Sequence, residues 1–304
     1  MKQILKACPL LVFSLLMSAC QKVDFESNDS EILENEDKVT LKVNVNQYEQ
    51  TDFESSRAVP IKNLCKRLSL GLYQDGKLVM KKNQYPNSPA LGRLELQVVP
   101  GNYQLLVFAH NNDTTATITQ PQEISFSPKK VTDTFINYQQ VDVQENTTIS
   151  VTLDRVVGMF RLCTEDNLPE NVAAVSIKYT GGSSTLNAVS GYGCVKSRQE
   201  ERFTMTNEMY GSPLQLDVYT FPRQDSQKLN VTINCLDDKE NILYSRQLDD
   251  VPIAKKQITR CKLKLFVDDS GETPDTPEIG TNNDVTIEIL AKDEWSTIDY
   301  KIVE

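Results

Sequence analysis

The sequence is poor in the residues on which enzyme active sites most often depend. Its 304 residues include one histidine, His110, and one tryptophan, Trp295, and the catalytic motifs GxSxG, GxGxxG, HExxH and the P-loop do not occur. One histidine leaves a zinc site short of ligands, and a nucleophile requires a base beside it. His110 follows an apolar run and precedes a polar turn, where we expect its side chain to be exposed. We therefore predict a protein that is not an enzyme and that uses no metal or cofactor.

Long apolar segments are also scarce, and the one near the N-terminus is too short to span a membrane. It runs from Leu10 to Met17 after Lys2 and Lys6, which is typical of a cleaved export signal. Its end, Met17-Ser18-Ala19-Cys20, resembles the bacterial lipobox, in which the cysteine is acylated and becomes the new N-terminus. We predict cleavage between Ala19 and Cys20, and a lipid on Cys20 that anchors the protein in the outer membrane at the cell surface. The alternative is an ordinary cleaved signal with a cysteine nearby.

Basic residues are outnumbered, and the cysteines do not form recognisable pairs. The net charge of −10 disfavours nucleic acid and anionic lipid surfaces as partners. Since no catalytic motif is present, we expect no small-molecule substrate either. We interpret most of the cysteines beyond Cys20 as small buried side chains, although an exported chain can form one or two disulfides, whose pairing the sequence leaves open. These cysteines are Cys65, Cys163, Cys194, Cys235 and Cys261.

The chain divides into four predicted regions. Residues 1–19 are the signal peptide, and residues 20–37 form a flexible tether, because residues 21–37 hold seven acidic residues and few apolar ones. Residues 38–155 and 156–304 form two antiparallel β-sandwich domains in tandem, since short strand-like runs recur without a helical pattern between them. The second domain contains an acidic loop, 268–284, which we interpret as solvated linker rather than a calcium site. It ends in a strand that could pack on its own domain or on another molecule.

Period-two alternation and turn residues locate the strands. In Lys38–Val45, the apolar residues Val39, Leu41, Val43 and Val45 fall on one face. Asp75-Gly76 predicts a hairpin turn, Pro100-Gly101 a turn between two strands, and Gly181-Gly182-Ser183-Ser184 a further hairpin turn. The strands expected in the first domain are 38–45, 67–73, 78–80, 93–99, 103–109 and 148–153. Those expected in the second are 156–162, 173–179, 202–206, 214–221, 228–235, 242–247, 258–267 and 285–290.

A series of short segments, in the order in which they occur, resembles the fimbrillin-type anchors and minor subunits (Fim- and Mfa-type) of type V pili. In the first half they are Glu54–Ile61 before Leu64-Cys65, Leu72-Tyr73 with Asp75-Gly76-Lys77, and Val99–Tyr103 before Val107–His110. In the second half they are Leu153–Arg161, Tyr179–Gly182, Val218–Pro222, Asp250–Ile253 and Trp295. The resemblance covers nearly the whole chain beyond the signal peptide.

The resemblance implies two transthyretin-like β-sandwich domains and a surface lipoprotein that joins other subunits by strand exchange. In that family, an extended segment of one subunit completes the sheet of its neighbour, which is a form of β-augmentation. Major subunits lose their N-terminal strand by cleavage after an arginine, whereas anchors keep lipid and strand together. Arg57 is the arginine best placed for such processing, and a cut there would detach the protein from Cys20.

We therefore predict a non-enzymatic fimbrial anchor or minor subunit, whose partners are other fimbrial subunits and the outer membrane. The alternative is a surface glycan-binding or adhesion lipoprotein unrelated to pilus assembly, although one tryptophan offers few rings for stacking on sugars. A lipoprotein hydrolase is a third hypothesis, disfavoured by the missing pair of nucleophile and base. Asp113-Thr114-Thr115 also resembles a short O-glycan acceptor motif of some Gram-negative envelopes.

Overall fold

The computed structural model describes residues 38–48, 65–127 and 130–266, together with the backbone of three short strands at 279–280, 286–291 and 298–300. All the regular secondary structure in these residues consists of β-strands, so the predicted all-β class is confirmed. No helix capable of spanning a membrane occurs in the part of the chain that the structure describes. The predicted signal peptide and tether lie outside the described residues, as does most of the acidic loop.

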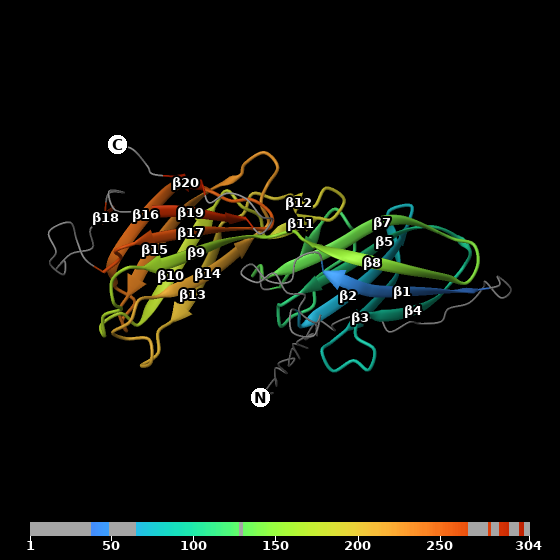
Figure 1. The fold of residues 1–304 in the computed structure, drawn as a ribbon, viewed down its shortest axis with the longest axis horizontal. Coiled ribbons are helices and arrows are strands. Elements are labelled where there is room, and N and C mark those ends of the chain that lie inside the picture. Colours follow the sequence, from blue (N-terminus) through green and yellow to red (C-terminus); the bar gives the residue numbers. More distant parts are fainter. Residues whose placement is uncertain are drawn as a thin grey trace, which may run out of the picture. The chain divides into compact units, whose positions relative to one another are not determined.

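Residues 39–155 supply the strands of a first β-sandwich. These are β1 (Val39–Tyr48), β2 (Arg67–Gln74), β3 (Lys77–Gln84), β4 (Arg93–Val98), β5 (Gly101–His110), β7 (Thr134–Val143) and β8 (Thr147–Arg155). Their order across the sheet is β3-β2-β5-β7-β8-β1-β4. All seven strands are labelled in Figure 1. Because β7 and β8 pair only beside Phe135 and Ile136, the strands separate there into two facing layers, with β2, β3, β5 and β7 in one and β1, β4 and β8 in the other.

Alternating side chains hold these layers together. In β4, Leu94, Leu96 and Val98 are buried, whereas the residues between them are exposed, and the inward residues of both layers form one core. Asp75 and Gly76 have φ angles of 51° and 75°, which suits the tight turn between β2 and β3, so the predicted hairpin is confirmed. The predicted turn at Pro100-Gly101 carries the chain from β4 in one layer to β5 in the other.

Residues 158–300 supply a second β-sandwich, whose layers have the orders β13-β10-β15-β16-β18 and β14-β9-β17-β19-β20. The strands of the first layer are β10 (Ala174–Thr180), β13 (Gln199–Thr204), β15 (Lys228–Leu236), β16 (Ile242–Pro252) and β18 (Ile279–Gly280). Those of the second are β9 (Gly158–Thr164), β14 (Gln215–Thr220), β17 (Gln257–Leu263), β19 (Thr286–Ala291) and β20 (Ile298–Tyr300). Buried residues of both layers, including Phe160 and Ile177, share one core. β19 pairs with β17, so the strand expected at 285–290 packs on its own sandwich.

The prediction of purely antiparallel sandwiches is wrong at three strand pairs. β1 runs parallel to β8, β9 runs parallel to β17, and β16 runs parallel to β18. In the first two cases, the two paired strands are far apart in the sequence. The long connection between them allows either a parallel or an antiparallel pairing. The alternation of apolar and polar residues indicates which face of a strand is buried, but it does not indicate the direction of the neighbouring strand. The finer description as tandem transthyretin-like domains, 38–155 and 156–304, stays a prediction.

A third cluster of buried apolar side chains joins residues from the two sandwiches. Phe126, which precedes β7, stacks on Phe221, which follows β14, with ring centroids 6.3 Å apart and planes 12° apart. A small sheet, β12-β11-β6, also combines the two parts of the chain: β6 (Ile124–Ser125), β11 (Thr185–Asn187) and β12 (Tyr192–Gly193). Ion pairs of 2.8 Å link Lys130 to Glu201 and Lys256 to Asp154. The two sandwiches therefore share a packed junction.

The segment Gly181-Gly182-Ser183-Ser184 is not the predicted hairpin turn. It leads the chain out of β10 and into β11, which belongs to a different sheet. Gly181 has a φ of +95°, and a Cβ atom there would lie 2.1 Å from the carbonyl oxygen of Lys228. A Cβ atom at Gly182 would lie 2.1 Å from Oγ1 of Thr220. Both glycines are therefore required by the close approach of other strands.

Three of the five cysteines are small buried side chains, as predicted from the sequence for most of them. Cys65, Cys235 and Cys261 are buried, Cys163 is half-buried and Cys194 is exposed. Cys163, Cys194, Cys235 and Cys261 are free thiols. Burial raises the pKa of the Cys261 thiol to about 12, which keeps it protonated and unreactive near neutral pH.

Candidate functional site: the groove filled by strand β1

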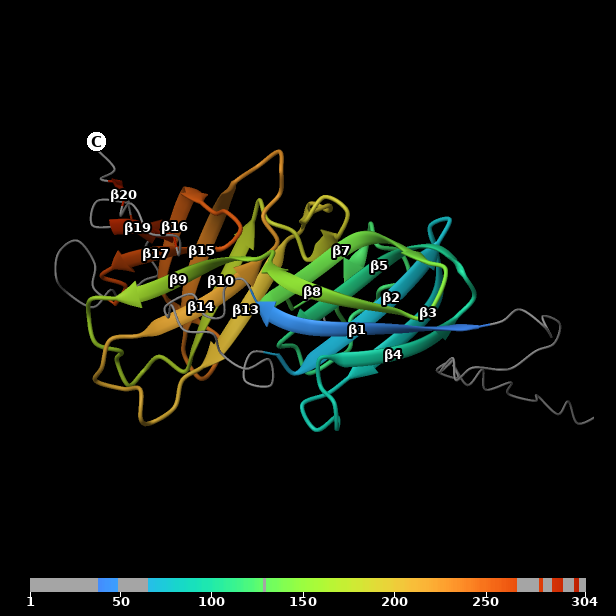
Figure 2. The same cartoon turned by 45° about the vertical axis from the view of Figure 1, so that its right-hand side comes forward.

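The strand β1 is the first element of the described chain, yet it lies inside its sheet rather than at an edge. It pairs antiparallel with β4, from Val39↔Val98 to Asn44↔Arg93, and parallel with β8, from Leu41↔Thr147 onward. Figure 2 shows β1 between β8 and β4 along most of its length. The two neighbouring strands thus form a groove whose occupant is β1, and both would lose backbone partners if β1 were removed.

The inward face of β1 fills the apolar floor of this groove. Leu41 and Val43 are fully buried, and Val39 and Val45 pack half-buried at the two ends. They contact the core that the other strands of the sandwich form, which includes Leu94 of β4. Burial of an aliphatic side chain of this size stabilises a fold by roughly 1.5–3 kcal/mol. Leu41 and Val43 therefore make β1 a major contributor to the core.

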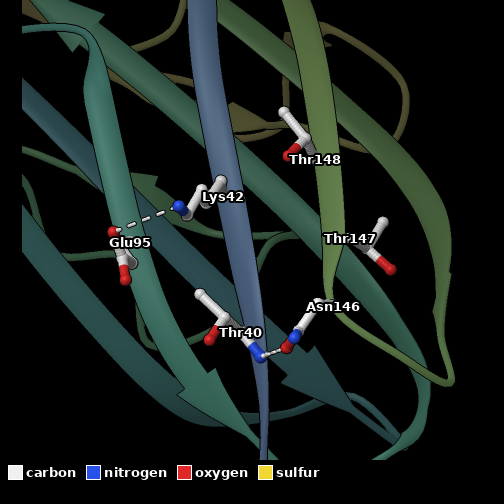
Figure 3. Close-up of a pocket in the computed structure, with 6 residues that line it drawn as sticks. All are labelled: Thr40, Lys42, Glu95, Asn146, Thr147 and Thr148. Carbon is white, nitrogen blue, oxygen red and sulfur yellow. Dashed lines mark hydrogen bonds and ion pairs between the residues drawn. The ribbon is translucent and has the colours of Figure 1, made fainter.

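The outward face of β1 borders a shallow polar hollow of about 200 Å³. The hollow is lined by Thr40 and Lys42 of β1, Glu95 of β4, and Asn146, Thr147 and Thr148 at the start of β8 (Figure 3). The backbone N–H of Thr40 donates to Oδ1 of Asn146 at 2.8 Å, and Nε2 of Gln97 donates to Oγ1 of Thr40 at 3.0 Å. Nζ of Lys42 lies 3.9 Å from Oε2 of Glu95, and both side chains are largely exposed.

The β4 wall of the groove is also held by contacts that do not involve β1. The side-chain amide of Gln84 donates to the carbonyl oxygens of Ala90 and Arg93, at 3.0 and 2.8 Å, and its oxygen accepts from the N–H of Gly92. Nζ of Lys82 donates to the carbonyl oxygen of Glu95 at 2.8 Å. These bonds tie the start of β4 to the end of β3, so the position of this wall does not depend on β1 alone.

On the other side of the groove, β8 is held at its end by Arg155. The guanidinium group of Arg155 makes two hydrogen bonds to the carboxylate of Asp133, at 2.8 and 2.9 Å, and lies over the ring of Phe135. Its side chain is fully buried, and bidentate pairs of this kind fix geometry as well as charge. Both walls of the groove are therefore braced by residues outside β1.

The predicted site residues Ala19, Cys20 and Arg57 lie outside the described residues, as does Trp295. In the sequence, Arg57 lies between the end of β1 at Tyr48 and the start of β2 at Arg67. A cut after Arg57 would therefore separate β1 from the rest of the sandwich covalently. The wall residues Glu95, Gln97 and Asn146 were not among the predicted site residues, because an exposed polar residue on a strand or in a turn gives no signal of its own.

His110 is not exposed as predicted, but fully buried at the end of β5. Its Nδ1 accepts the N–H of Asn112 at 3.2 Å, and its ring lies against those of Phe108 and Phe126. Burial, together with the nearby Arg67, lowers the pKa of His110 to about 3. The expectation failed because strand β5 continues through His110, and the residues around Phe126 cover its outer face. No group of His, Cys, Asp and Glu residues suited to a metal ion occurs in the described ranges.

The O-glycan-like segment Asp113-Thr114-Thr115 lies at the surface near His110. Asp113 pairs with Nζ of Lys66 at 2.7 Å, and this bond lowers the pKa of the carboxyl group. The hydroxyl of Thr114 is within 3.1 Å of Oδ1 of Asn112, whereas Thr115 is exposed. Glycosylation of this segment stays a prediction.

The comparisons with known proteins give one family and a set of similar folds. A family model described as a family of unknown function (DUF6562) matches residues 30–302. A candidate polysaccharide-binding protein (DUF1812) from Bacteroides thetaiotaomicron has a TM-score of 0.53 and 12% identity, over 87% of this chain and 99% of that chain. A candidate adhesin from Bacteroides ovatus has a TM-score of 0.50 and 12% identity, over 88% and 96% of the two chains. At this identity, both show a shared fold.

The fimbrial anchor protein Mfa2 from Porphyromonas gingivalis has a TM-score of 0.42 and 12% identity, over 74% of this chain and 90% of that chain. No curated protein matches the chain.

Proposed function

The chain belongs to the DUF6562 family of unknown function, and we propose that it is a non-enzymatic fimbrial anchor or minor subunit. In this proposal, a lipid on Cys20 holds it in the outer membrane at the cell surface, and it joins other fimbrial subunits by strand complementation. The observation that carries the proposal is the place of β1: the N-terminal strand fills a groove inside the sheet, between β4 and β8.

The position of β1 supports the proposal for a physical reason. A strand at a sheet edge can be lost with little effect on its neighbours, but a strand between two others leaves two unpaired backbones and an apolar floor. Such a groove accepts a replacement strand with alternating apolar side chains. Because β1 and Cys20 belong to one uncut chain in the proposed anchor, the sandwich stays connected to the lipid even when the strand of another subunit replaces β1 in the groove. This arrangement suits a subunit that ends a polymer at the membrane.

Lipidation is tested by substituting Cys20. We expect Cys20→Ala to abolish incorporation of a labelled fatty acid and to release the protein from the outer-membrane fraction. Cys194→Ala is the matched control, because Cys194 is the exposed thiol of the folded part. An unlabelled wild-type protein in the periplasm, or equal labelling of the Cys20→Ala variant, would contradict the anchor.

Strand complementation is tested with the full chain, carrying a site for a sequence-specific protease between residues 49 and 64. After cutting, we expect an excess of dye-labelled peptide 38–48 to replace the original β1 slowly. The control peptide carries Leu41→Asp, which places a charge on the apolar floor and should not be captured. If the cut protein remains folded and captures neither peptide, then β1 is a fixed structural strand and strand complementation is wrong.

A further inference from the structure

We infer that two side chains in the wall of the groove, Glu95 and Gln97, hold β1 in one register and select its sequence over that of other strands, while Asn146 binds the backbone of β1 whatever its sequence. The inference rests on the proposed function, in which the groove accepts an extended strand. Each of the three side chains contacts an outward-facing position of β1, and Figure 3 shows two of these contacts across the polar hollow.

The inward face of β1 does not define its register alone. A slip by one residue is excluded, because it would turn the polar residues of β1 onto the apolar floor. A slip by two residues keeps the alternation: Leu41 moves to the place of Val39, Val43 to that of Leu41 and Val45 to that of Val43. The two fully buried places then both hold valine, and the half-buried place of Val45 loses its apolar side chain, because Asn46 and Gln47 follow it in the sequence. Another strand with the same alternation would fit the floor in the same way.

The outward contacts do distinguish these arrangements. Asn146 accepts the backbone N–H of residue 40, which any residue in that place would donate, whereas Gln97, directly opposite Thr40, donates to the side-chain hydroxyl. Glu95 lies directly opposite Lys42, with the charged atoms 3.9 Å apart. After a slip by two residues, Lys42 would face the donor amide of Gln97, and the neutral Asn44 would face Glu95. Both side-chain pairings would be lost together.

The groove therefore specifies the chemistry of its occupant. It fits an extended strand with alternating apolar residues on one face and, on the other, a hydroxyl followed two residues later by a cation. An acidic residue at the second position would meet the like charge of Glu95. An exposed ion pair contributes roughly 0.2–1 kcal/mol, so each contact alone discriminates weakly and the selection depends on several contacts together. The chain's own β1 satisfies all of them.

The register is tested in the uncut chain by disulfide trapping. Asn44→Cys with Arg93→Cys reports the observed register, because these residues are direct partners, and Asn44→Cys with Thr148→Cys reports a slip by two residues. We expect the first pair alone to cross-link in the natural groove. When Glu95 and Gln97 are both replaced by alanine, we expect cross-linking of the second pair to rise several-fold. The control carries Arg202→Ala and Glu240→Ala, which remove an exposed ion pair of the second sandwich.

The sequence preference is tested in the cut chain with labelled peptides. We expect the peptide with Lys42→Glu to be captured about 2–5-fold less well than the natural peptide, and Glu95→Lys in the groove to reverse this order.

These two measurements separate the inference from the proposed function. Failure to capture any peptide would contradict the proposed strand complementation, while the disulfide test of the register would still apply to the uncut chain. If cross-linking of the slipped pair does not increase in the double variant, the floor and the bulge between Val45 and Gln47 set the register, and the inference is wrong. Equal capture of both peptides, unchanged by Glu95→Lys, would also overturn it.

Discussion

His110 is a buried, uncharged base, and its burial makes the stability of the protein depend on pH. Its pKa is about 3 in the folded protein, against an ordinary value of 6.5. Between these two values the unfolded chain binds a proton that the folded chain does not. The free energy of unfolding therefore decreases as the pH falls from 6.5 towards 3, by about 1.4 kcal/mol for each unit of pKa difference.

Replacing His110 by glutamine should remove this contribution while keeping an acceptor near the N–H of Asn112. We expect the His110→Gln variant to lose less stability than the natural protein between pH 6.5 and 3, as measured by urea unfolding at several pH values. Carboxylates titrate in the same range in both proteins, so the difference between the two curves isolates His110. Parallel curves would show that His110 does not titrate as described.

Gly181 gives a second prediction at the residue scale. An added Cβ atom would combine a positive φ with a 2.1 Å approach to the carbonyl oxygen of Lys228, and a backbone atom cannot easily move away. We expect Gly181→Ala to lower the free energy of unfolding by more than about 2 kcal/mol. Gly76→Ala is the control, since Gly76 also has a positive φ but has nothing within 4 Å of the added atom. Equal losses would mean that φ alone matters at Gly181.

At the scale of elements, β1 contributes to stability almost entirely through its inward face. Leu41 is fully buried, so we expect Leu41→Ala to lower the free energy of unfolding by about 2–5 kcal/mol. Lys42, the next residue, is largely exposed, and Lys42→Ala should change stability by less than about 0.5 kcal/mol. Denaturant unfolding of both variants measures this difference. Similar values for the two would contradict the placement of β1 in the core.

The same alternation explains which elements can be predicted from the sequence. Strands such as β1 and β4 have one buried face and one exposed face, so their apolar residues alternate clearly. The strand β7, Thr134–Val143, was not predicted, because its first residues are buried on both faces and Tyr138-Gln139-Gln140 then breaks the pattern. The strands that form the walls of the groove could not be predicted, since alternation does not tell which strands become neighbours. For the same reason, the parallel pairing of β1 with β8 came only from the structure.

At the scale of the whole molecule, the junction between the sandwiches should make them unfold together. Phe126 and Phe221 stack within the third apolar cluster, and β6 pairs with β11 in the same region. We expect one calorimetric transition for the natural protein, and two after Phe221→Ala. The control is Phe160→Ala, which removes a ring from the core of the second sandwich only. Two transitions in the natural protein would show that the junction does not couple the sandwiches.

Anchoring is also a property of the whole molecule, because it requires that the lipid, β1 and both sandwiches remain in one chain. The most direct test of the proposed function is the intact mass of the protein extracted from its native membrane. We predict one uncut chain that begins at Cys20 and carries a diacyl or triacyl modification. A lipid-free chain that begins at Ala58 would contradict the anchor, because β1 and its membrane attachment would then have been removed together.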